Sequence, residues 1–358
     1  MNWTKIFKSA GITTGVCLTI TLVVFLVYSL AIRAPQVQVD RPFFGLNPDS
    51  VIGAGSGNSG AWDADFSDIL NQVTDEELFD DVWERRPNFY TFLLFALDNQ
   101  FNADAIWVVG FSTETHELHI VDFPRDIRVL TADRTIQRLN AAYPIGYVRA
   151  GHDEGVRDFR NEIAWVTGFE VDFYMSVTMQ AFARAVDVFG GVTVDIPRRM
   201  EYISPEQNLH INLFPGVQRL TGTQAMHFAR WRQNTDHTGN IGTEGRLQHI
   251  FMLFEALARE ARTPATLLRI PDLLATYRSY VRTDLELSNL LYFANEFLRN
   301  DVEMHLHRIP VSYITRPRWY DVPYHDETLE LINRTINPFT RDIEVIMFVE
   351  EIEEEEEQ

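Results

Sequence analysis

Alternating apolar and polar stretches predict a set of neighbouring strands in the first half of the chain. A continuous apolar run, Tyr90–Leu97, ends at Asp98 and is typical of a strand buried on both faces. Two further runs rich in β-branched and aromatic residues, Ala105–Ser112 and Leu118–Phe123, are separated by the polar segment Thr113–Glu117. This spacing predicts an antiparallel hairpin.

The register of this hairpin brings ionisable residues together. With the turn centred on Glu114–Thr115, Asp104 at the start of one strand faces Arg125 at the end of the other. Asp126 follows directly in the sequence. We therefore expect three ionisable groups to meet at one edge of the sheet, and we expect the chemistry of the protein there.

Further along, residues with helical spacing alternate with short strand-like runs. Helices are predicted over Val156–Thr167, Met179–Phe189, Gly222–Trp231, Glu244–Arg262, Pro264–Thr276, Leu285–Leu298 and Asp326–Ile336. Strands are predicted over Phe173–Val177, Val192–Ile196 and His305–Val311. Thr221 is expected to open one helix, and Thr243 is expected to cap the long helix that follows. Strands interleaved with helices predict an α/β fold with a layered sheet flanked by helices.

The N-terminal segment predicts a membrane anchor. Residues Ala10–Ile32 carry no charge and are numerous enough to cross a bilayer as a helix. Lys5 and Lys8 precede this segment, so the positive-inside rule places residues 1–9 in the cytoplasm and the rest outside the cell. The prediction is a single-pass protein of the cell membrane. A cleaved signal peptide is the alternative.

Composition divides the part beyond the anchor into three regions. Residues 33–88 are predicted to be an extracellular tether, because they contain the Gly/Ser segment Gly53–Gly60 and only one short helical pattern, Ile69–Trp83. Residues 89–335 contain nearly all of the predicted strands and helices and are predicted to form the folded domain. Residues 336–358 are predicted to be an acidic tail, whose terminal glutamates remain solvated.

Charge and cysteine content exclude some classes of function. The 358-residue chain has a formal net charge of −20, which argues against a nucleic-acid-binding surface because phosphate backbones require a basic one. Its single cysteine, Cys17, excludes a disulfide framework. The sequence contains no P-loop, GxSxG, HExxH or CxxC pattern, and the histidines show no ligand spacing.

In such an acidic chain, arginines beside polar loops are informative. They are Arg125, Arg138, Arg230, Arg232 and Arg246. Guanidinium groups bind phosphate oxygens in a bidentate way and stay charged. A carboxylate such as Asp98 or Asp104 would be repelled by phosphate unless it held a cation such as Mg²⁺ or acted as a base. These residues predict a pyrophosphate site with a carboxylate-bound metal.

A structural interpretation of the same residues remains open. Asp104 and Arg125 could form an ordinary ion pair. Arg230 and Arg232 could simply complement the dipole at the C-terminal end of their helix.

Several stretches in the same order resemble the LytR-CpsA-Psr family. They are LLFALD (Leu93–Asp98), ADAIW (Ala103–Trp107), FPRD (Phe123–Asp126), RLNAAY (Arg138–Tyr143), VDVFGGVTVDIP (Val186–Pro197) and GVQRLTGTQAMHFARWR (Gly216–Arg232). The resemblance spans roughly residues 89–335. It implies a membrane-anchored phosphotransferase that moves a glycopolymer phosphate from a polyprenyl-pyrophosphate carrier to peptidoglycan, assisted by Mg²⁺.

The resemblance also implies roles for single residues. Asp98 and Asp104 match the family's acidic positions near the metal and pyrophosphate, and Asp98 is the candidate base. Arg125 matches the pyrophosphate-binding arginine, and Arg230 and Arg232 match a later pair that contacts the phosphates. The further substrate-binding candidates are Arg138, Arg246 and Gln248.

One segment departs from the family pattern Asp-x-Gly-Arg-x-x-Arg-Gln-Gln. Between Asn240 and Gln248, Asn240 replaces the acid, Thr243 the first arginine and Leu247 the first glutamine. Asp236 is a candidate to replace the lost acid in space. The departure leaves two alternatives open: a non-catalytic binder of polyprenyl phosphates or wall polymer, and a polyprenyl-pyrophosphate hydrolase.

Overall fold

The structure is a computed structural model that describes residues 34–37, 83–98, 101–131, 135–206, 208–263, 272, 280–314 and 318–349. The predicted anchor (residues 10–32), the predicted helix Pro264–Thr276 apart from Asp272, nearly all of the predicted helix Ile69–Trp83 and the terminal glutamates lie outside these residues. Within them, no helix is both long enough and apolar enough to cross a membrane.

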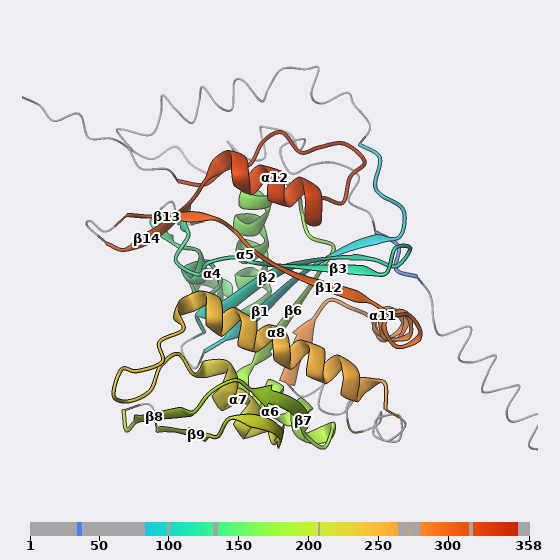
Figure 1. The fold of residues 1–358 in the computed structure, drawn as a ribbon. Helices are drawn as coiled ribbons and strands as arrows, with labels where there is room; N and C mark the ends of the chain where they lie inside the picture. The colour runs from blue at the N-terminus through green and yellow to red at the C-terminus, as the bar shows by residue number, and fades with distance from the viewer. Residues whose placement is uncertain are drawn as a thin grey trace, which may run out of the picture. The chain divides into compact units, whose positions relative to one another are not determined.

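A six-stranded mixed sheet forms the centre of the main compact unit (Figure 1). Its strands are β1 (Phe89–Leu97), β2 (Ala103–Ser112), β3 (Glu117–Asp122), β6 (Phe173–Thr178), β11 (Val281–Thr283) and β12 (Glu303–Arg308). Their order is β11-β6-β1-β2-β3-β12. Strands β2 and β3 are antiparallel, with Ser112 opposite Glu117 and Trp107 opposite Asp122, which confirms the predicted hairpin and its register.

Helices cover both faces of the sheet because successive side chains of each strand point to opposite sides. On one face, Phe95 and Ile106 pack with Phe159 of α5 in the largest core. Helices α4 (Ala142–Ala150), α5 (His152–Thr167) and α12 (His325–Thr335) contribute to this core. On the other face, Trp107 and Val109 form a smaller cluster with Phe254 of α8 (Gly242–Ala261).

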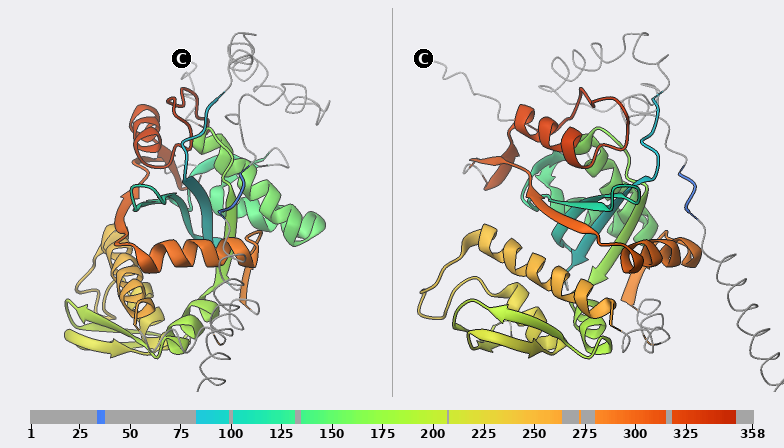
Figure 2. Two further views of the ribbon diagram at one scale, coloured as in Figure 1. Left: turned by 90° about the vertical axis from the view of Figure 1, so that its right-hand side faces the viewer. Right: turned by 45° about the vertical axis from the view of Figure 1, so that its right-hand side comes forward.

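A second layer lies on the far side of α8 from the sheet (Figures 1 and 2). It contains α6 (Met179–Val188), α7 (Gly222–Arg230) and the strands β7 (Val192–Ile196), β8 (Met200–Ser204), β9 (Leu209–Leu213) and β10 (Gly216–Leu220). Its core includes Val186, Phe228 and Leu253, the last from α8. Helix α8 therefore belongs to two cores at once, one on each side.

Short elements lie between the larger ones in the chain. They are β4 (Arg128–Leu130), β5 (Ile136–Arg138), the 3₁₀ helix η3 (Leu139–Ala141), β13 (Val311–Ile314) and β14 (Tyr320–Pro323). The single strand predicted over His305–Val311 is divided into β12 and β13. Pro310 lies between them and has no N–H group for a strand ladder.

The start of α8 differs from the prediction. The helix begins at Gly242 after an Ile241 cap that makes no side-chain hydrogen bond, so Thr243 is not its cap. Instead, the Asn240 side-chain oxygen accepts a hydrogen bond of 2.8 Å from the Gly242 N–H. Gly242 has a positive φ of 61°, so the chain turns into the helix before it reaches Thr243.

The folded domain extends beyond the boundary predicted at residue 335. Ile336, Phe339, Ile343 and Ile346 are buried in the main core, and Trp83 packs against Phe339 at a ring distance of 5.2 Å. The acidic composition of the chain end hid these apolar positions.

Helix α11 (Leu287–Arg299) falls in a second compact unit together with the residues that precede it from Leu285. It confirms the helix predicted over Leu285–Leu298. The candidate site described below lies entirely in the main unit.

Candidate functional site

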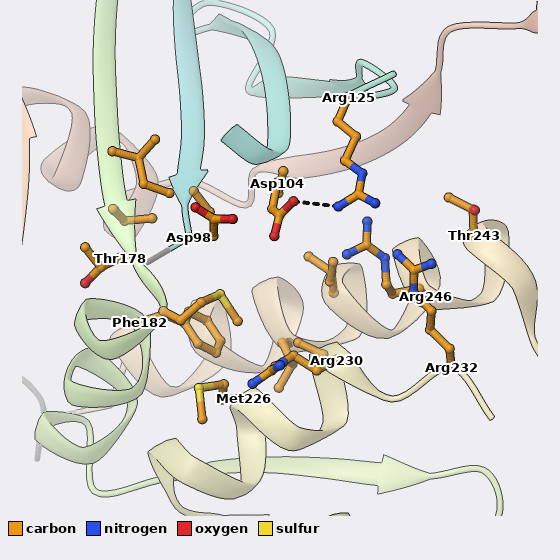
Figure 3. A pocket seen from close by; sticks show the side chains of 18 of the residues that line it. Asp98, Asp104, Arg125, Thr178, Phe182, Met226, Arg230, Arg232, Thr243 and Arg246 are labelled. Carbon is orange, nitrogen blue, oxygen red and sulfur yellow. Dashed lines mark hydrogen bonds and ion pairs between the residues drawn. The ribbon is translucent and has the colours of Figure 1, made fainter. Parts of the chain in front are cut away.

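A large cavity lies between the ends of β1 and β2 and the helices α6, α7 and α8 (Figure 3). Its volume is about 1010 Å³. Five of the residues predicted for the site, and a sixth expected to bind substrate, line it: Asp98, Asp104, Arg125, Arg230, Arg232 and Arg246. The structure therefore gathers segments that are far apart in the sequence around one space.

The turn after β1 fixes Asp98. Its Oδ1 accepts a hydrogen bond of 2.8 Å from the Asn102 backbone N–H, and its Oδ2 accepts one of 3.0 Å from the Asn102 side chain. The Phe101 N–H donates to the Asp98 carbonyl oxygen at 3.2 Å. These contacts hold the carboxylate at the end of the buried strand, where it faces the cavity.

The hairpin register brings Arg125 to Asp104. Arg125 Nη1 donates to Asp104 Oδ1 at 2.6 Å, and Arg125 Nε lies 3.6 Å from Asp126 Oδ2. Burial acts to lower the pKa of Arg125, but the hydrogen bond and charge of Asp104, together with Asp126, raise it overall. The three ionisable groups meet at the sheet edge as predicted.

Helix α7 delivers two more arginines. A capping box fixes its start: the Thr221 hydroxyl accepts from the Gln224 N–H, and the Gln224 side chain accepts from the Thr221 N–H. At its other end Trp231 is 1% exposed and sits in the core of the second layer, between Arg230 and Arg232 in sequence. The buried indole of Trp231 thus anchors the backbone between the two arginines.

The beginning of α8 lies against the end of α7. The Ile241 N–H donates to the Arg232 carbonyl oxygen at 3.0 Å, which joins the two segments. One turn further, Arg246 points into the cavity, with Asn240 and Thr243 also lining it. Arg246 Nε is buried and has no hydrogen-bond partner among the described residues.

Three guanidinium groups gather at one end of the cavity. Figure 3 shows those of Arg125, Arg232 and Arg246 close together, whereas that of Arg230 points elsewhere, beside Met226. Burial lowers the pKa of Arg232 and of Arg246, and the neighbouring positive charges lower both further. A cluster of partly buried like charges is costly without an anion, so this end of the cavity favours a ligand with several negative charges.

Apolar side chains also line the cavity: Phe182, Leu209, Met226, Ile250, Leu253 and Phe254. Figure 3 shows Phe182 and Met226 away from Arg125, with the guanidinium of Arg230 beside Met226. Such a lining suits a hydrocarbon chain. The prediction from sequence named none of these positions as ligand-facing, because periodicity does not separate a cavity wall from an ordinary core.

Asp122 is a buried carboxylate behind the site that the sequence analysis missed. Its Oδ1 accepts a hydrogen bond of 3.1 Å from the indole N–H of Trp107, which lines the cavity. Its Oδ2 lies 3.6 Å from Arg308 Nη1. Burial raises its pKa to about 6, against the opposing charges of Arg308 and Arg246. The hairpin register, which pairs Trp107 with Asp122, is the signal that could have found this pair.

Three candidates lie apart from the cavity wall. Arg138 Nε contacts Asp126 Oδ1 at 3.2 Å and donates to the Trp319 carbonyl oxygen at 3.1 Å. Gln248 is exposed on α8. Asp236 Oδ1 accepts from the backbone and hydroxyl of Thr238, so this carboxylate faces its own loop and does not replace the missing acid in the cavity.

The donor set for a metal consists of two carboxylates. Asp98 and Asp104 both face the cavity (Figure 3). In the described part of the chain, no group of three or more His, Cys, Asp or Glu side chains is arranged to hold a metal ion. The pair fits Mg²⁺, which commonly takes one or two carboxylates and completes its shell with substrate phosphates and water.

Fold and cavity together define a layered α/β protein with a cationic and apolar binding site. The family model described as the LytR_cpsA_psr family matches residues 70–335, which is more than half of the chain. The protein therefore belongs to the LytR_cpsA_psr family.

Two teichoic acid transferases resemble the chain at low sequence identity. The polyisoprenyl-teichoic acid–peptidoglycan teichoic acid transferase TagU of Oceanobacillus iheyensis is 24% identical over 241 residues, covering 65% of this chain and 69% of the relative. The corresponding transferase TagV of Bacillus subtilis is 25% identical over 193 residues, covering 51% and 47%. The chain thus spans about half the length of TagV and about two thirds of the length of TagU.

Solved structures share the fold. Bacillus subtilis TagU has a TM-score of 0.51 at 17% identity, covering 69% of this chain and 95% of that one. A structure of TagT bound to LI-WTA has a TM-score of 0.53 at 15% identity, covering 69% and 89%. At these identities the likeness establishes the fold.

Proposed function

We propose that this protein transfers a phosphate-linked glycopolymer from a polyprenyl-pyrophosphate carrier to a hydroxyl group of peptidoglycan. One observation carries the proposal: the guanidinium groups of Arg125, Arg232 and Arg246 converge at one end of a cavity that is also lined by apolar side chains such as Phe182 and Met226. A lipid pyrophosphate has matching parts, because it joins two linked phosphoryl groups to a hydrocarbon chain. The names of the relatives TagU and TagV support this class of reaction.

In the proposed reaction, the acceptor oxygen attacks the phosphorus next to the sugar. The bond between that phosphorus and the bridging oxygen breaks, and polyprenyl phosphate leaves with the bonding electrons. The arginines bind the phosphoryl oxygens and stabilise the negative charge that spreads over them in the transition state. Asp98, which is fixed at the cavity edge by Asn102, is the candidate acceptor of the hydroxyl proton.

Mg²⁺ fits this proposal as a cofactor. Asp98 and Asp104 would hold it, and it would neutralise charge on the phosphoryl oxygens. Removing divalent cations with a chelator is expected to abolish transfer, and added Mg²⁺ is expected to restore it.

We further propose that residues 10–32 anchor the protein in the cell membrane with the catalytic domain outside. The uncharged run and the lysines before it support this placement. A substrate carried by a polyprenyl lipid is consistent with an enzyme held at the membrane surface.

The test is a reconstituted reaction. The full chain is incubated with a polyprenyl-pyrophosphoryl saccharide, Mg²⁺ and peptidoglycan, and two products are measured: saccharide phosphate bound to peptidoglycan and free polyprenyl phosphate. Both are expected in equal amounts. Arg125→Ala is expected to reduce the rate by about 10²–10³-fold, as for loss of one charge-stabilising donor. Arg219→Ala, outside the cavity and paired with Glu260 at 2.8 Å, is the matched control.

Other product patterns would contradict transfer and identify the alternatives. Release of phosphate products without attachment to peptidoglycan would indicate a hydrolase. Tight binding of the lipid without any product, unchanged by Mg²⁺, would indicate a non-catalytic binder. The binder is the alternative that Thr243 favours, because it lines the cavity where the family pattern has an arginine. In that case Thr243→Arg would be the variant to test for recovered turnover.

A further inference from the structure

Two exposed aromatic rings lie side by side at the antiparallel pair β13–β14, one in β13 and one directly before β14. Figure 1 shows where this pair of strands lies. Tyr313 is 62% exposed and Trp319 is 51% exposed. Their ring centroids are 5.7 Å apart, with planes inclined at 43°. Single exposed apolar residues are common, but a contiguous pair of large rings is typical of an interaction site. We call these two residues the aromatic pair.

The aromatic pair is joined to the phosphate end of the cavity. The Asp321 N–H in β14 donates to the Asp126 carbonyl oxygen at 2.9 Å, which attaches the hairpin to the loop that carries Arg125. A second connection runs through Arg138, whose Nε contacts both the Trp319 carbonyl oxygen and Asp126 Oδ1. These contacts fix the position of the aromatic pair relative to Arg125.

The contacts of Arg138 lie within this attachment. Its guanidinium contacts the Trp319 carbonyl oxygen and Asp126, and it does not line the cavity. Arg138 therefore links the backbone of Trp319 to the loop of Arg125.

The location distinguishes between possible ligands. The lipid chain of the proposed substrate would lie against Phe182 and Met226, which are away from Arg125 in Figure 3. A molecule that attacks the phosphate must therefore arrive at the Arg125 end, where the hairpin is attached. A bilayer surface also attracts Trp and Tyr. Binding to anionic vesicles is therefore measured beside binding to a saccharide.

We propose that Tyr313 and Trp319 form a binding site for the sugar chain of the acceptor, with the rings packed against the C–H faces of pyranose units. A pyranose face is apolar while its hydroxyl groups stay hydrated, which suits amphipathic rings at a wet surface. The inference rests on the proposed function, because only a transferase requires a saccharide acceptor at this end of the cavity. The site would hold the sugar chain so that one hydroxyl reaches the phosphorus.

A direct binding measurement tests this site without the lipid substrate. A soluble β-1,4-linked hexamer of N-acetylglucosamine is titrated into the full chain by calorimetry. The wild type is expected to bind. Trp319→Ala is expected to weaken binding by about tenfold or more, as for loss of an aromatic anchor, whereas Trp319→Phe should retain most of it. Phe214→Ala is the matched control, since Phe214 is 58% exposed and lies on the turn between β9 and β10. Circular dichroism verifies that each variant is folded.

Three results would overturn the inference: no binding of the hexamer by the wild type, equal binding by Trp319→Ala, or loss in Trp319→Ala of binding to anionic vesicles alone. The last would assign the aromatic pair to the bilayer.

In the transfer reaction, Trp319→Ala should raise the KM for the acceptor and leave the KM for the lipid substrate unchanged. If transfer is absent while hexamer binding depends on Trp319, the proposed function fails separately from the sugar site.

Discussion

Arg125 shows how far single residues of the site can be predicted from sequence. Its contact with Asp104 follows from counting residues around a short turn, because opposite positions in a hairpin are fixed by its register. Arg246 is different. It reaches the same space because α8 packs between the sheet and the second layer, with the Ile241 N–H bound to the Arg232 carbonyl oxygen. Local sequence pattern does not determine how these segments approach one another.

The buried Asp122 gives a prediction about pH and stability. Its pKa is about 6 in the folded protein and near 3.8 when exposed, so the folded chain binds this proton more tightly than the unfolded chain. The contribution of Asp122 to the free energy of unfolding therefore falls as pH rises from 3.8 to about 6. The size of this fall is about 3 kcal/mol for a shift of about two pH units.

Urea unfolding of the wild type and Asp122→Asn across this pH range measures the effect. The amide can still accept the Trp107 N–H bond but does not ionise, so the variant should gain stability relative to the wild type as pH rises. Asp195→Asn, at an exposed position of β7, controls for loss of a carboxylate. A difference between wild type and Asp122→Asn that stays constant with pH would contradict this account.

At the scale of elements, strongly periodic segments were predicted correctly, whereas of two predicted helix caps Thr221 is confirmed and Thr243 is not. Helices α5, α6, α7 and α12 and strands β1, β2, β3 and β7 lie where apolar spacing placed them. The hairpin β8–β9 lies in a segment, Arg198–Pro215, to which the sequence analysis assigned no element. The cap of α8 was mispredicted because Asn240 and Gly242 turn the chain before Thr243 does.

The capping box of α7 gives a prediction at this scale. Thr221→Ala removes the hydroxyl that accepts from the Gln224 N–H and should lower the free energy of unfolding by about 1 kcal/mol. Thr223→Ala is the matched control, because Thr223 is exposed on the same helix; its effect should stay within about 0.5 kcal/mol. Urea unfolding of both variants measures the difference. Equal stability of the two variants would mean that the cap does not stabilise the helix that carries Arg230.

At the scale of the main unit, the site lies between two packed layers. The sheet side supplies Asp98, Asp104 and Arg125, and the second layer supplies Phe182, Met226 and Arg232. Helix α8 packs against both layers and contributes Arg246. Sequence predicted the layers, since strands and helices interleave, but not which residues line the cavity between them. A cavity depends on how the two cores meet, and no single segment encodes that.

The central claim is that the clustered arginines bind two linked phosphoryl groups. It is tested most directly by the dissociation constant of farnesyl pyrophosphate, measured with the full chain and with Arg232→Ala, with farnesyl monophosphate and Arg219→Ala as controls. The account predicts that the wild type prefers the pyrophosphate and that Arg232→Ala weakens its binding by about tenfold or more, the effect of losing a charge-assisted bond. Equal affinity of wild type and Arg232→Ala for the pyrophosphate would contradict the account.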